Sequence, residues 1–292
     1  MKQAQGSSPS WAGMTLSSPF KKFLKSILRL KPVQWLRYNQ ISQNLAALAR
    51  TLLIRMTGNR FLVKTSLTLC KNTERYAALF GKSENNLKIW LSPIRNELGF
   101  PLGRIYNEKF ESVDAEVLYA AVRHFKPQKI IEIGCGHSTF FALDAIRKNE
   151  RGEIVCIDPE PRRRLPRQAR YLACKIEEAP LSLFENLEKD DILFIDSSHT
   201  KEEATYHAQE ILPRLKPGVV VHHHDILYPY EPVYDEEPVI LDFYLNQRNR
   251  WEILLGSAYL RHRHRDLLYG MFPSFRINEQ RAGGSLWTRK TC

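Results

Sequence analysis

Cysteine is scarce in this chain of 292 residues, and its five cysteines share no close spacing. They are Cys70, Cys135, Cys156, Cys174 and Cys292. An odd number of scattered cysteines without a Cys-x-x-Cys pair indicates neither a disulfide framework nor a thiolate zinc site. We therefore expect the protein to work in a reducing compartment, the cytoplasm.

Long uncharged apolar runs are also missing. None approaches the roughly 18 residues that a membrane-spanning helix needs. The start of the chain lacks the apolar core of a secretory signal, although its serine-rich, acid-poor composition is compatible with an organellar transit peptide. The sequence therefore predicts no spanning helix.

Acidic side chains are nearly absent from residues 1–80, where Glu74 is the single acid beside 13 lysines and arginines. The rest of the chain holds 30 basic and 31 acidic side chains, so the formal charge of +11 belongs to the N-terminal segment. We predict a basic, mainly helical extension over residues 1–84 and one domain over residues 85–292. Because that domain has no excess positive charge, we do not expect specific binding of nucleic acid.

Residues 18–30 have the pattern of a short amphipathic helix. Ser18 can cap it, Pro19 suits its first position, and apolar side chains recur on one face opposite four cations. Such a helix binds the surface of an anionic membrane, so we expect residues 18–60 to make the protein peripheral on one. The pattern equally fits a helix that packs against the domain or a partner subunit.

Beyond residue 112, short apolar runs alternate with helical stretches. This alternation is typical of βαβ units around a parallel sheet. We expect strands at residues 129–133, 153–157, 171–175, 191–195, 219–223, 251–256 and 284–289. Helices are expected at residues 87–98, 114–124, 138–148, 181–187 and 202–215.

A glycine loop, Glu132-Ile-Gly-Cys-Gly-His-Ser138, follows the first of these strands. Gly134 and Gly136 let the backbone approach a ligand, and Asp158, 22 residues past Gly136, can accept hydrogen bonds from a ribose. Thr139 stands where a dinucleotide-binding loop has its third glycine. The loop therefore favours another adenosine-containing ligand, and Glu132 suits one with a cationic or amino group.

Acids and histidines follow the fourth and fifth strands. The carboxyl ends of parallel strands meet at one edge of a sheet, so Asp196 and Asp225 should converge there. His199 is our candidate general base, with capping of the next helix as the alternative. In His222-His-His224, strand alternation sends the outer two to one face and His223 to the other, so the three cannot act as one cluster.

Five ordered motifs resemble those of class I S-adenosylmethionine-dependent methyltransferases, most closely the branch often called methyltransferase domain 24. The similarity covers about residues 105–292 and also includes Asn107–Phe110 and Gly283–Trp287. The five motifs are Glu-Ile-Gly-Cys-Gly (132–136), Ile-Asp-Pro (157–159), Phe-Ile-Asp-Ser-Ser-His (194–199), Leu-Lys-Pro-Gly-Val (215–219) and His-His-Asp-Ile (223–226).

The resemblance implies a doubly wound, Rossmann-like α/β fold with a seven-stranded, mostly parallel sheet whose last strand is antiparallel. It places S-adenosylmethionine across the glycine loop, with Asp158 on the ribose and Glu177 near the adenine. The residues expected to bind the cofactor are Glu132, Gly134, Gly136, His137, Ser138, Asp158, Glu177 and Asp196.

Acids at the positions of Asp196 and Asp225 resemble the magnesium ligands of metal-dependent relatives. This chain has His224 where those relatives often carry a second carboxylate. The candidate ligands for a magnesium or manganese ion are therefore Asp196, His224 and Asp225.

We predict an enzyme that methylates a hydroxyl of a small polar molecule or of a sugar in a glycan. Asp196, His199 and Asp225 are its candidate catalytic residues, and the aromatic, proline-rich segment 228–238 is a candidate wall or lid over the acceptor. Two other interpretations stay open at this point. The first is a nicotinamide-dependent oxidoreductase, and the second is a catalytically silent module that binds S-adenosylmethionine and scaffolds a membrane complex.

Overall fold

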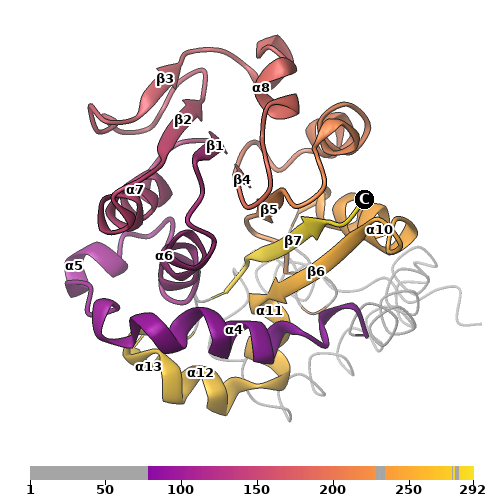
Figure 1. Cartoon of the computed structure of the whole chain (residues 1–292). Coiled ribbons are helices and arrows are strands. Elements are labelled where there is room, and N and C mark those ends of the chain that lie inside the picture. Colours follow the sequence, from indigo (N-terminus) through magenta and orange to yellow (C-terminus); the bar gives the residue numbers. More distant parts are fainter. Residues whose placement is uncertain (1–77, 228–229, 231–233, 278, 280–282) are drawn as a thin grey trace, which may run out of the picture. The chain divides into compact units, whose positions relative to one another are not determined.

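The computed structural model of the chain describes residues 78–227, 230, 234–277, 279 and 283–292 (Figure 1). The chain divides into two compact units, residues 1–66 and 67–292. The first unit, with the predicted helix at residues 18–30, lies outside the described residues. In the second unit Phe80 and Ser83 are already buried, on the N-terminal side of the predicted boundary at residue 84.

Seven strands form one sheet in the order β3-β2-β1-β4-β5-β7-β6 (Figure 1). The first five pair in parallel, and β7 is antiparallel to both β5 and β6. The predicted seven-stranded, mostly parallel sheet is therefore confirmed. The strands are β1 (Lys129–Ile133), β2 (Glu153–Ile157), β3 (Arg170–Leu172), β4 (Ile192–Ile195), β5 (Val220–His223), β6 (Trp251–Gly256) and β7 (Leu286–Lys290).

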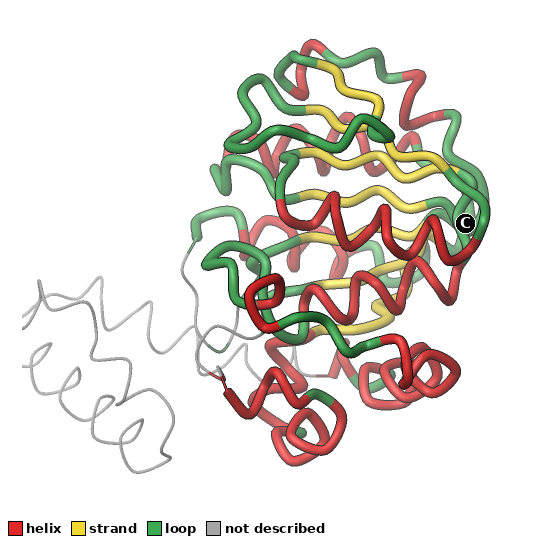
Figure 2. Tube along the Cα trace, turned by 90° about the vertical axis from the view of Figure 1, so that its left-hand side faces the viewer, coloured by secondary structure: helices red, strands yellow, loops and turns green. Residues whose placement is uncertain are grey.

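Helices cover both faces of the sheet, so the central strands are buried along nearly their whole length (Figure 2). Ile130 of β1 belongs to one buried core and its neighbour Ile131 to the other. The first core contains side chains of α4 (Ser83–Leu91), α6 (Asp114–Phe125), α7 (His137–Asn149), α11 (Ser257–Arg263), α12 (Arg265–Met271) and α13 (Pro273–Ile277). The second contains side chains of α8 (Ser182–Glu185), α9 (Lys201–Tyr206) and α10 (Glu237–Asn246).

Shorter helices complete the described part of the chain. They are η2 (Ala78–Phe80), η3 (Ser92–Glu97), α5 (Leu102–Ile105), η4 (Ile176–Glu178), the π-helical turn η5 (His207–Ile211) and η6 (Leu212–Arg214). No helix within the described ranges has the length and hydropathy to span a membrane.

Some expected elements differ from the observed ones. The strand expected at residues 171–175 is β3, which is shorter and begins one residue earlier. The single helix expected at residues 202–215 is α9, then η5 and η6, and Pro213 lies in the last of these because proline cannot continue an α-helix. Likewise, the helix expected at residues 87–98 starts at Ser83 and changes to the 3-10 form around Pro93.

Candidate active site

The loop after β1 makes the sharp turn that its glycines predict. Gly134 has a φ of +78°, and a Cβ there would lie 1.7 Å from the carbonyl oxygen of Asp196, so only glycine fits between the ends of β1 and β4. Gly136, at the start of α7, has a φ of −176°, and a Cβ there would meet nothing within 4 Å. The loop therefore contacts the protein on the side of Gly134 and is open on the side of Gly136.

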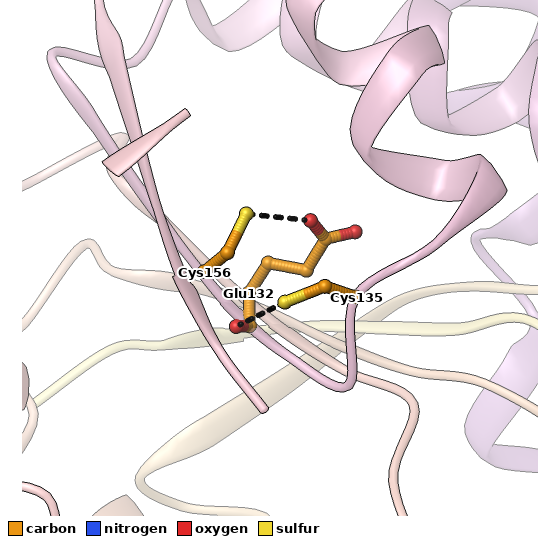
Figure 3. A group of neighbouring side chains, drawn as sticks. All are labelled: Glu132, Cys135 and Cys156. Carbon is orange, nitrogen blue, oxygen red and sulfur yellow. Dashed lines mark hydrogen bonds between the residues drawn. The ribbon is translucent and has the colours of Figure 1, made fainter. Parts of the chain in front are cut away.

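Glu132 lies beneath this loop and is buried (Figure 3). Its carboxylate accepts hydrogen bonds from the hydroxyls of Ser138 at 2.6 Å and Thr139 at 2.5 Å. Burial raises the pKa of Glu132 to about 7, although these hydroxyls favour its charged form. Glu132 and Ser138 thus tie the first turn of α7 to β1, and their expected contact with the cofactor stays a prediction.

Two thiols share this buried position (Figure 3). Cys156 donates to the Glu132 carboxylate at 3.4 Å, and Cys135 donates to the Glu132 carbonyl oxygen at 3.7 Å. The two sulfurs and a carboxylate oxygen lie within 4.8 Å of one another, a spacing that a metal ion can bridge. However, the pKa of Cys135 is raised by its hydrogen bond with Cys156 and by burial, which disfavours the thiolate that a metal needs. We therefore interpret the group as part of the core.

Asp158 lies where β2 ends, beside the glycine loop. One carboxylate oxygen accepts the backbone N–H of Cys135 at 2.9 Å, and the other accepts that of Glu160 at 2.8 Å. The predicted ribose-binding carboxylate is thus fixed at the rim of the loop. His137, on the first turn of α7, lies with its ring against the Arg163 guanidinium, while Glu177 is exposed on η4.

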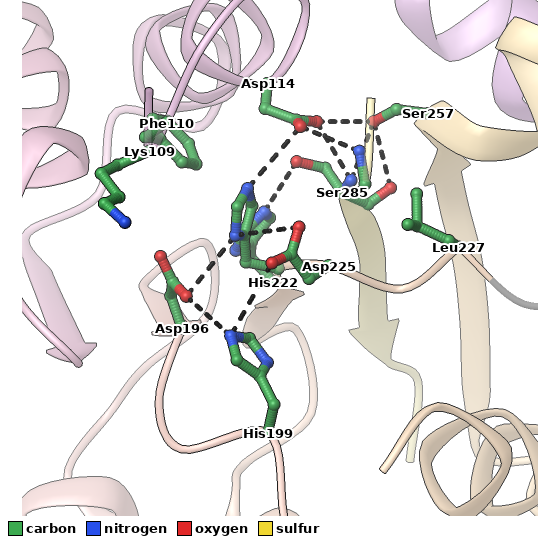
Figure 4. Close-up of polar contacts among 12 residues, drawn as sticks. Lys109, Phe110, Asp114, Asp196, His199, His222, Asp225, Leu227, Ser257 and Ser285 are labelled. Carbon is green, nitrogen blue, oxygen red and sulfur yellow. Dashed lines mark hydrogen bonds and ion pairs between the residues drawn. The ribbon is translucent and has the colours of Figure 1, made fainter. Parts of the chain in front are cut away.

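The residues predicted to act on the methyl-accepting substrate lie where β4 and β5 end. They are Asp196, His199 and Asp225, and their side chains point toward one another (Figure 4). His199 Nε2 lies 3.5 Å from Asp196 Oδ1 and 3.8 Å from Asp225 Oδ2. His224 Nδ1 lies 3.5 Å from Asp196 Oδ1 and 3.6 Å from Asp225 Oδ1. This four-residue cluster of two histidines and two aspartates borders the glycine loop, because Gly134 packs against the backbone of Asp196.

Two carboxylates that the sequence analysis did not select lie behind the histidines. Asp114, the first residue of α6, lies 3.7 Å from His224 Nε2. Glu236, just before α10, is 2.6 Å from His199 Nδ1. An acid in the first turn of a helix is common, and Glu236 stands in an acidic run, so neither carried a signal that could be separated from these ordinary patterns.

In this cluster, interactions between charged groups shift the pKa values more than burial does. Burial alone would lower the pKa of His199, but Asp196 and Glu236 raise it to about 10. Burial alone would raise the pKa of Asp114, but hydrogen bonds with His224 and Ser285 help to lower it to about 2. The pKa of His224 is raised in the same way by Asp225 and Asp196. The neighbouring carboxylates thus favour the protonated form of both imidazoles.

The cluster is also locally strained and incompletely bonded. His199 and Asp225 have φ values of 58° and 57°, which non-glycine residues rarely adopt. His224 is 94% buried, yet its Nδ1 makes no hydrogen bond within the described part of the chain. A buried polar atom without a hydrogen-bond partner, aimed at two carboxylates, suits a cation held between them.

The remaining histidines of β5 lie as the strand alternation predicted. His222 is buried, stacks on Phe194 with 4.1 Å between ring centroids, and is 2.9 Å from the Ser285 hydroxyl. His223 faces the other core and lies 2.9 Å from the Tyr244 hydroxyl. Both are core residues with polar partners.

The segment expected to wall the acceptor is described in part. Tyr234 stacks on His199 with 4.3 Å between ring centroids. Glu237 holds the turn by accepting the backbone N–H groups of Leu227 at 2.5 Å and Tyr234 at 2.8 Å. The end of the segment therefore covers His199, and residues 228–229 and 231–233 lie outside the description.

Comparisons with known proteins give one family match and several similarities at low coverage or low identity. Residues 131–226 match a family model described as a methyltransferase domain. A protein from Archaeoglobus fulgidus, described as uncharacterized, is 35% identical over 94 residues, which cover 30% of this chain and 42% of that protein. The chain thus matches less than half the length of that relative.

Two solved structures are similar at low identity. One is an O-methyltransferase from Bacillus cereus in complex with S-adenosylhomocysteine, at 14% identity and a TM-score of 0.42, covering 75% of this chain and 96% of that chain. The other is an O-methyltransferase from Streptomyces achromogenes in complex with S-adenosylmethionine, at 14% identity and a TM-score of 0.40, covering 70% and 90%. The residues that match the methyltransferase-domain model, 131–226, contain the glycine loop after β1 and the ends of β4 and β5 where the cluster lies.

Proposed function

We propose that the chain transfers a methyl group from S-adenosylmethionine to a hydroxyl of a small polar molecule or of a sugar. The observation that carries this proposal is the contact between two sites at one sheet edge. Gly134 of the glycine loop packs against Asp196, and Asp196 belongs to the cluster of Asp196, His199, His224 and Asp225. A cofactor bound on the loop therefore lies next to groups that can bind and deprotonate an acceptor.

The chain's first task is to align the two reactants. Methyl transfer is an in-line displacement, so the acceptor oxygen must face the methyl group on the side opposite the departing sulfur. Gly136 leaves open space beside the loop, and Asp158 stands at its rim. The carboxylate oxygens of Asp196 and Asp225 can accept hydrogen bonds from the substrate hydroxyl and so position it. Tyr234 stacks on His199 and covers the cluster on that side.

The second task is to make the hydroxyl a nucleophile. Asp196 and Glu236 raise the pKa of His199, our predicted base, to about 10 and so favour its protonated form. His199 can act as a base only in its neutral form, which a positive charge beside these carboxylates would favour by lowering that pKa. The cofactor sulfonium is one such charge. A divalent cation held by Asp196, His224 and Asp225 is another, and when bound it would lower the pKa of the acceptor hydroxyl.

The oxidoreductase and the silent scaffold remain as alternatives. A nicotinamide dinucleotide is disfavoured because Thr139 replaces the third glycine and donates its hydroxyl to Glu132. The scaffold is disfavoured by the convergence of four titratable side chains in one cluster, which a pure binding module does not need.

Thermal unfolding of the full chain with added ligands tests the proposal. Saturating S-adenosylhomocysteine should raise the Tm, and NAD should not. Incubation with S-adenosylmethionine and a panel of sugars, glycans and small polyols should release S-adenosylhomocysteine. Stabilisation by NAD alone would support the oxidoreductase, and cofactor binding without turnover on any acceptor would support the scaffold.

A further inference from the structure

The loop between β2 and β3 is rich in arginine. Five of the nine residues from 162 to 170 are arginine, and residues 161–176 contain no aspartate or glutamate. All five side chains are exposed, and none forms an ion pair with a residue in the described part of the chain. This arginine loop consists of Arg162, Arg163, Arg164, Arg167 and Arg170 with the residues between them. It therefore presents five guanidinium groups to solvent without an acidic partner.

The arginine loop is fixed beside the glycine loop. The guanidinium carbon of Arg163 lies 4.5 Å from the centre of the Phe140 ring, and the same guanidinium contacts the ring of His137. Both partners belong to the start of α7, directly after the glycine loop. Ala169 donates its backbone N–H to the carbonyl of Pro166 at 3.0 Å, which closes a turn in the loop. Because these contacts already order the segment, a ligand would bind it at a low entropic cost.

The same edge of the sheet carries the arginine loop and the four-residue cluster. The arginine loop follows the carboxyl end of β2, and the cluster follows the carboxyl ends of β4 and β5, which run parallel to it. β1 lies between β2 and β4 (Figure 1), and neighbouring strands are about 4.8 Å apart, so the ends of β2 and β4 are about 10 Å apart. A short chain of linked sugars can span that distance.

The rest of the domain has the opposite charge. Residues 81–292 hold 30 basic and 31 acidic side chains, and without the five arginines of the loop 25 basic side chains stand against the 31 acids. A long polyanion such as a nucleic acid would therefore meet net negative charge outside the loop. Residues 162–170 also lack an aromatic side chain on which a base could stack. These observations favour a short anionic ligand over a nucleic acid.

We propose that the arginine loop is an accessory subsite that holds a carboxylate or phosphate group of an acidic glycan, while a hydroxyl of that glycan lies at the four-residue cluster. This inference names the class of the acceptor and rests on the proposed function for the role of the cluster. Guanidinium groups suit the subsite, because their planar fork of N–H donors matches the oxygens of carboxylates and phosphates. The loop thus selects acidic sugars by a charge distant from the reacting atoms.

Calorimetry on the full chain saturated with S-adenosylhomocysteine tests the subsite. The probes are trigalacturonic acid, its neutral methyl ester and a trisaccharide that carries phosphate monoesters. Both anionic trisaccharides should bind at least tenfold more tightly than the neutral ester, and added salt should weaken their binding because exposed charges are screened. The tighter of the two identifies the anionic group that the loop prefers.

A triple variant removes three charges of the loop and keeps Arg163 in its contact with α7. Its changes are Arg162→Gln, Arg164→Gln and Arg167→Gln. It should weaken the binding of the anionic trisaccharides about 10- to 100-fold and leave S-adenosylhomocysteine affinity unchanged. The matched control removes three exposed charges before β1, β2 and β4, at the opposite edge of the sheet, and should bind every probe as the unchanged protein does. Its changes are Lys126→Gln, Arg151→Gln and Lys189→Gln.

Three results overturn the subsite: equal binding of acidic and neutral trisaccharides, no binding of either anionic one, or equal losses in the two triple variants. Tighter binding of an RNA oligonucleotide of equal charge, lost in the loop variant, overturns it in favour of nucleic acid. Each of these leaves the methyltransferase proposal standing as long as S-adenosylhomocysteine binds and another acceptor is methylated. Conversely, a chain that binds the anionic trisaccharides through the loop but does not bind S-adenosylhomocysteine would refute the proposed function and keep the anion site.

Discussion

Asp158 links the end of β2 to the glycine loop, and its role in cofactor binding can be measured directly. Asp158→Ala should weaken S-adenosylmethionine binding by about 1.5–3 kcal/mol, the value of hydrogen bonds to a charged group. Asp158→Asn keeps an oxygen for the backbone N–H of Cys135 and should show how much of this loss comes from the loop. Calorimetry gives both values, and Glu160→Ala, at an exposed neighbour, serves as control. Equal affinity of all four proteins would remove Asp158 from the ribose.

Glu132 gives the domain a dependence of stability on pH. Burial raises its folded-state pKa from 4.5 to about 7, so between these values the unfolded chain loses a proton that the folded chain keeps. Stability from this group is therefore complete below about pH 4.5 and is lost as pH rises through about 7. Across that window the loss is about 3 kcal/mol.

Glu132→Gln should remove most of this dependence, because the amide keeps an acceptor for Ser138 and cannot ionise. Urea unfolding at pH 5 and pH 8 measures it. The difference in unfolding free energy between the two pH values should shrink in the variant, with exposed Glu177→Gln as control. An unchanged difference would mean that Glu132 ionises as readily inside the protein as in water.

At the scale of elements, the two loop glycines should respond to the same substitution in opposite ways. Gly134→Ala places a Cβ 1.7 Å from the Asp196 carbonyl oxygen at a φ of +78°, so we expect severe loss of stability. Gly136→Ala meets nothing within 4 Å and should fold normally. If the open side is where the cofactor lies, Gly136→Ala should nevertheless lose at least tenfold in S-adenosylhomocysteine affinity. Unaltered affinity of a folded Gly136→Ala protein would place the cofactor elsewhere.

The elements that the sequence predicted best are those buried on both sides. Residues 130–133 of β1 and 154–157 of β2 are all buried and mostly apolar, and both strands were predicted to the residue. By contrast, β3 is at the sheet edge, where Arg170 and Tyr171 are exposed, so no apolar pattern marks its ends. The three helices between β6 and β7 were not predicted, because each is at most seven residues long and the charged run Arg261–Arg265 spans the end of α11 and the start of α12.

The same reasoning explains which site residues were found. Asp196, His199 and Asp225 follow strands whose carboxyl ends must meet, so their convergence was predicted from topology. Asp114 and Glu236 come from elements whose packing against the cluster depends on the tertiary structure. Contacts that depend on tertiary packing produce no periodic pattern or fixed spacing of residues in the sequence, so these two acids could not be predicted.

On the scale of the whole molecule, charge is unevenly distributed along the chain. Residues 1–80 hold 13 lysines and arginines and one acid, while the remainder is close to neutral. A nearly neutral α/β domain joined to a strongly basic segment favours attraction to an anionic surface that the domain alone would not bind. We therefore propose that the N-terminal segment makes the protein peripheral on a membrane, where a lipid-linked acceptor would be within reach.

Co-sedimentation with vesicles tests this proposal. The full chain should bind vesicles containing anionic phospholipid and not neutral ones, and added salt should weaken the binding because exposed charges are screened. Deleting residues 1–66, the first compact unit, should abolish it. Each of Lys21, Lys22, Lys25 and Arg29 should contribute about 1 kcal/mol, so replacing one by Gln should weaken binding about fivefold.

The alternative for this segment is that its apolar stripe packs against the domain or a partner subunit. In that case the cations would face solvent, and removing residues 1–66 would lower the Tm of the domain or change its mass in solution. The membrane proposal expects the truncated protein to keep its Tm and its S-adenosylhomocysteine affinity, because the segment would contribute to neither. Equal sedimentation of the truncated and full chains with anionic vesicles would show that the surface bound by lipid belongs to the domain itself.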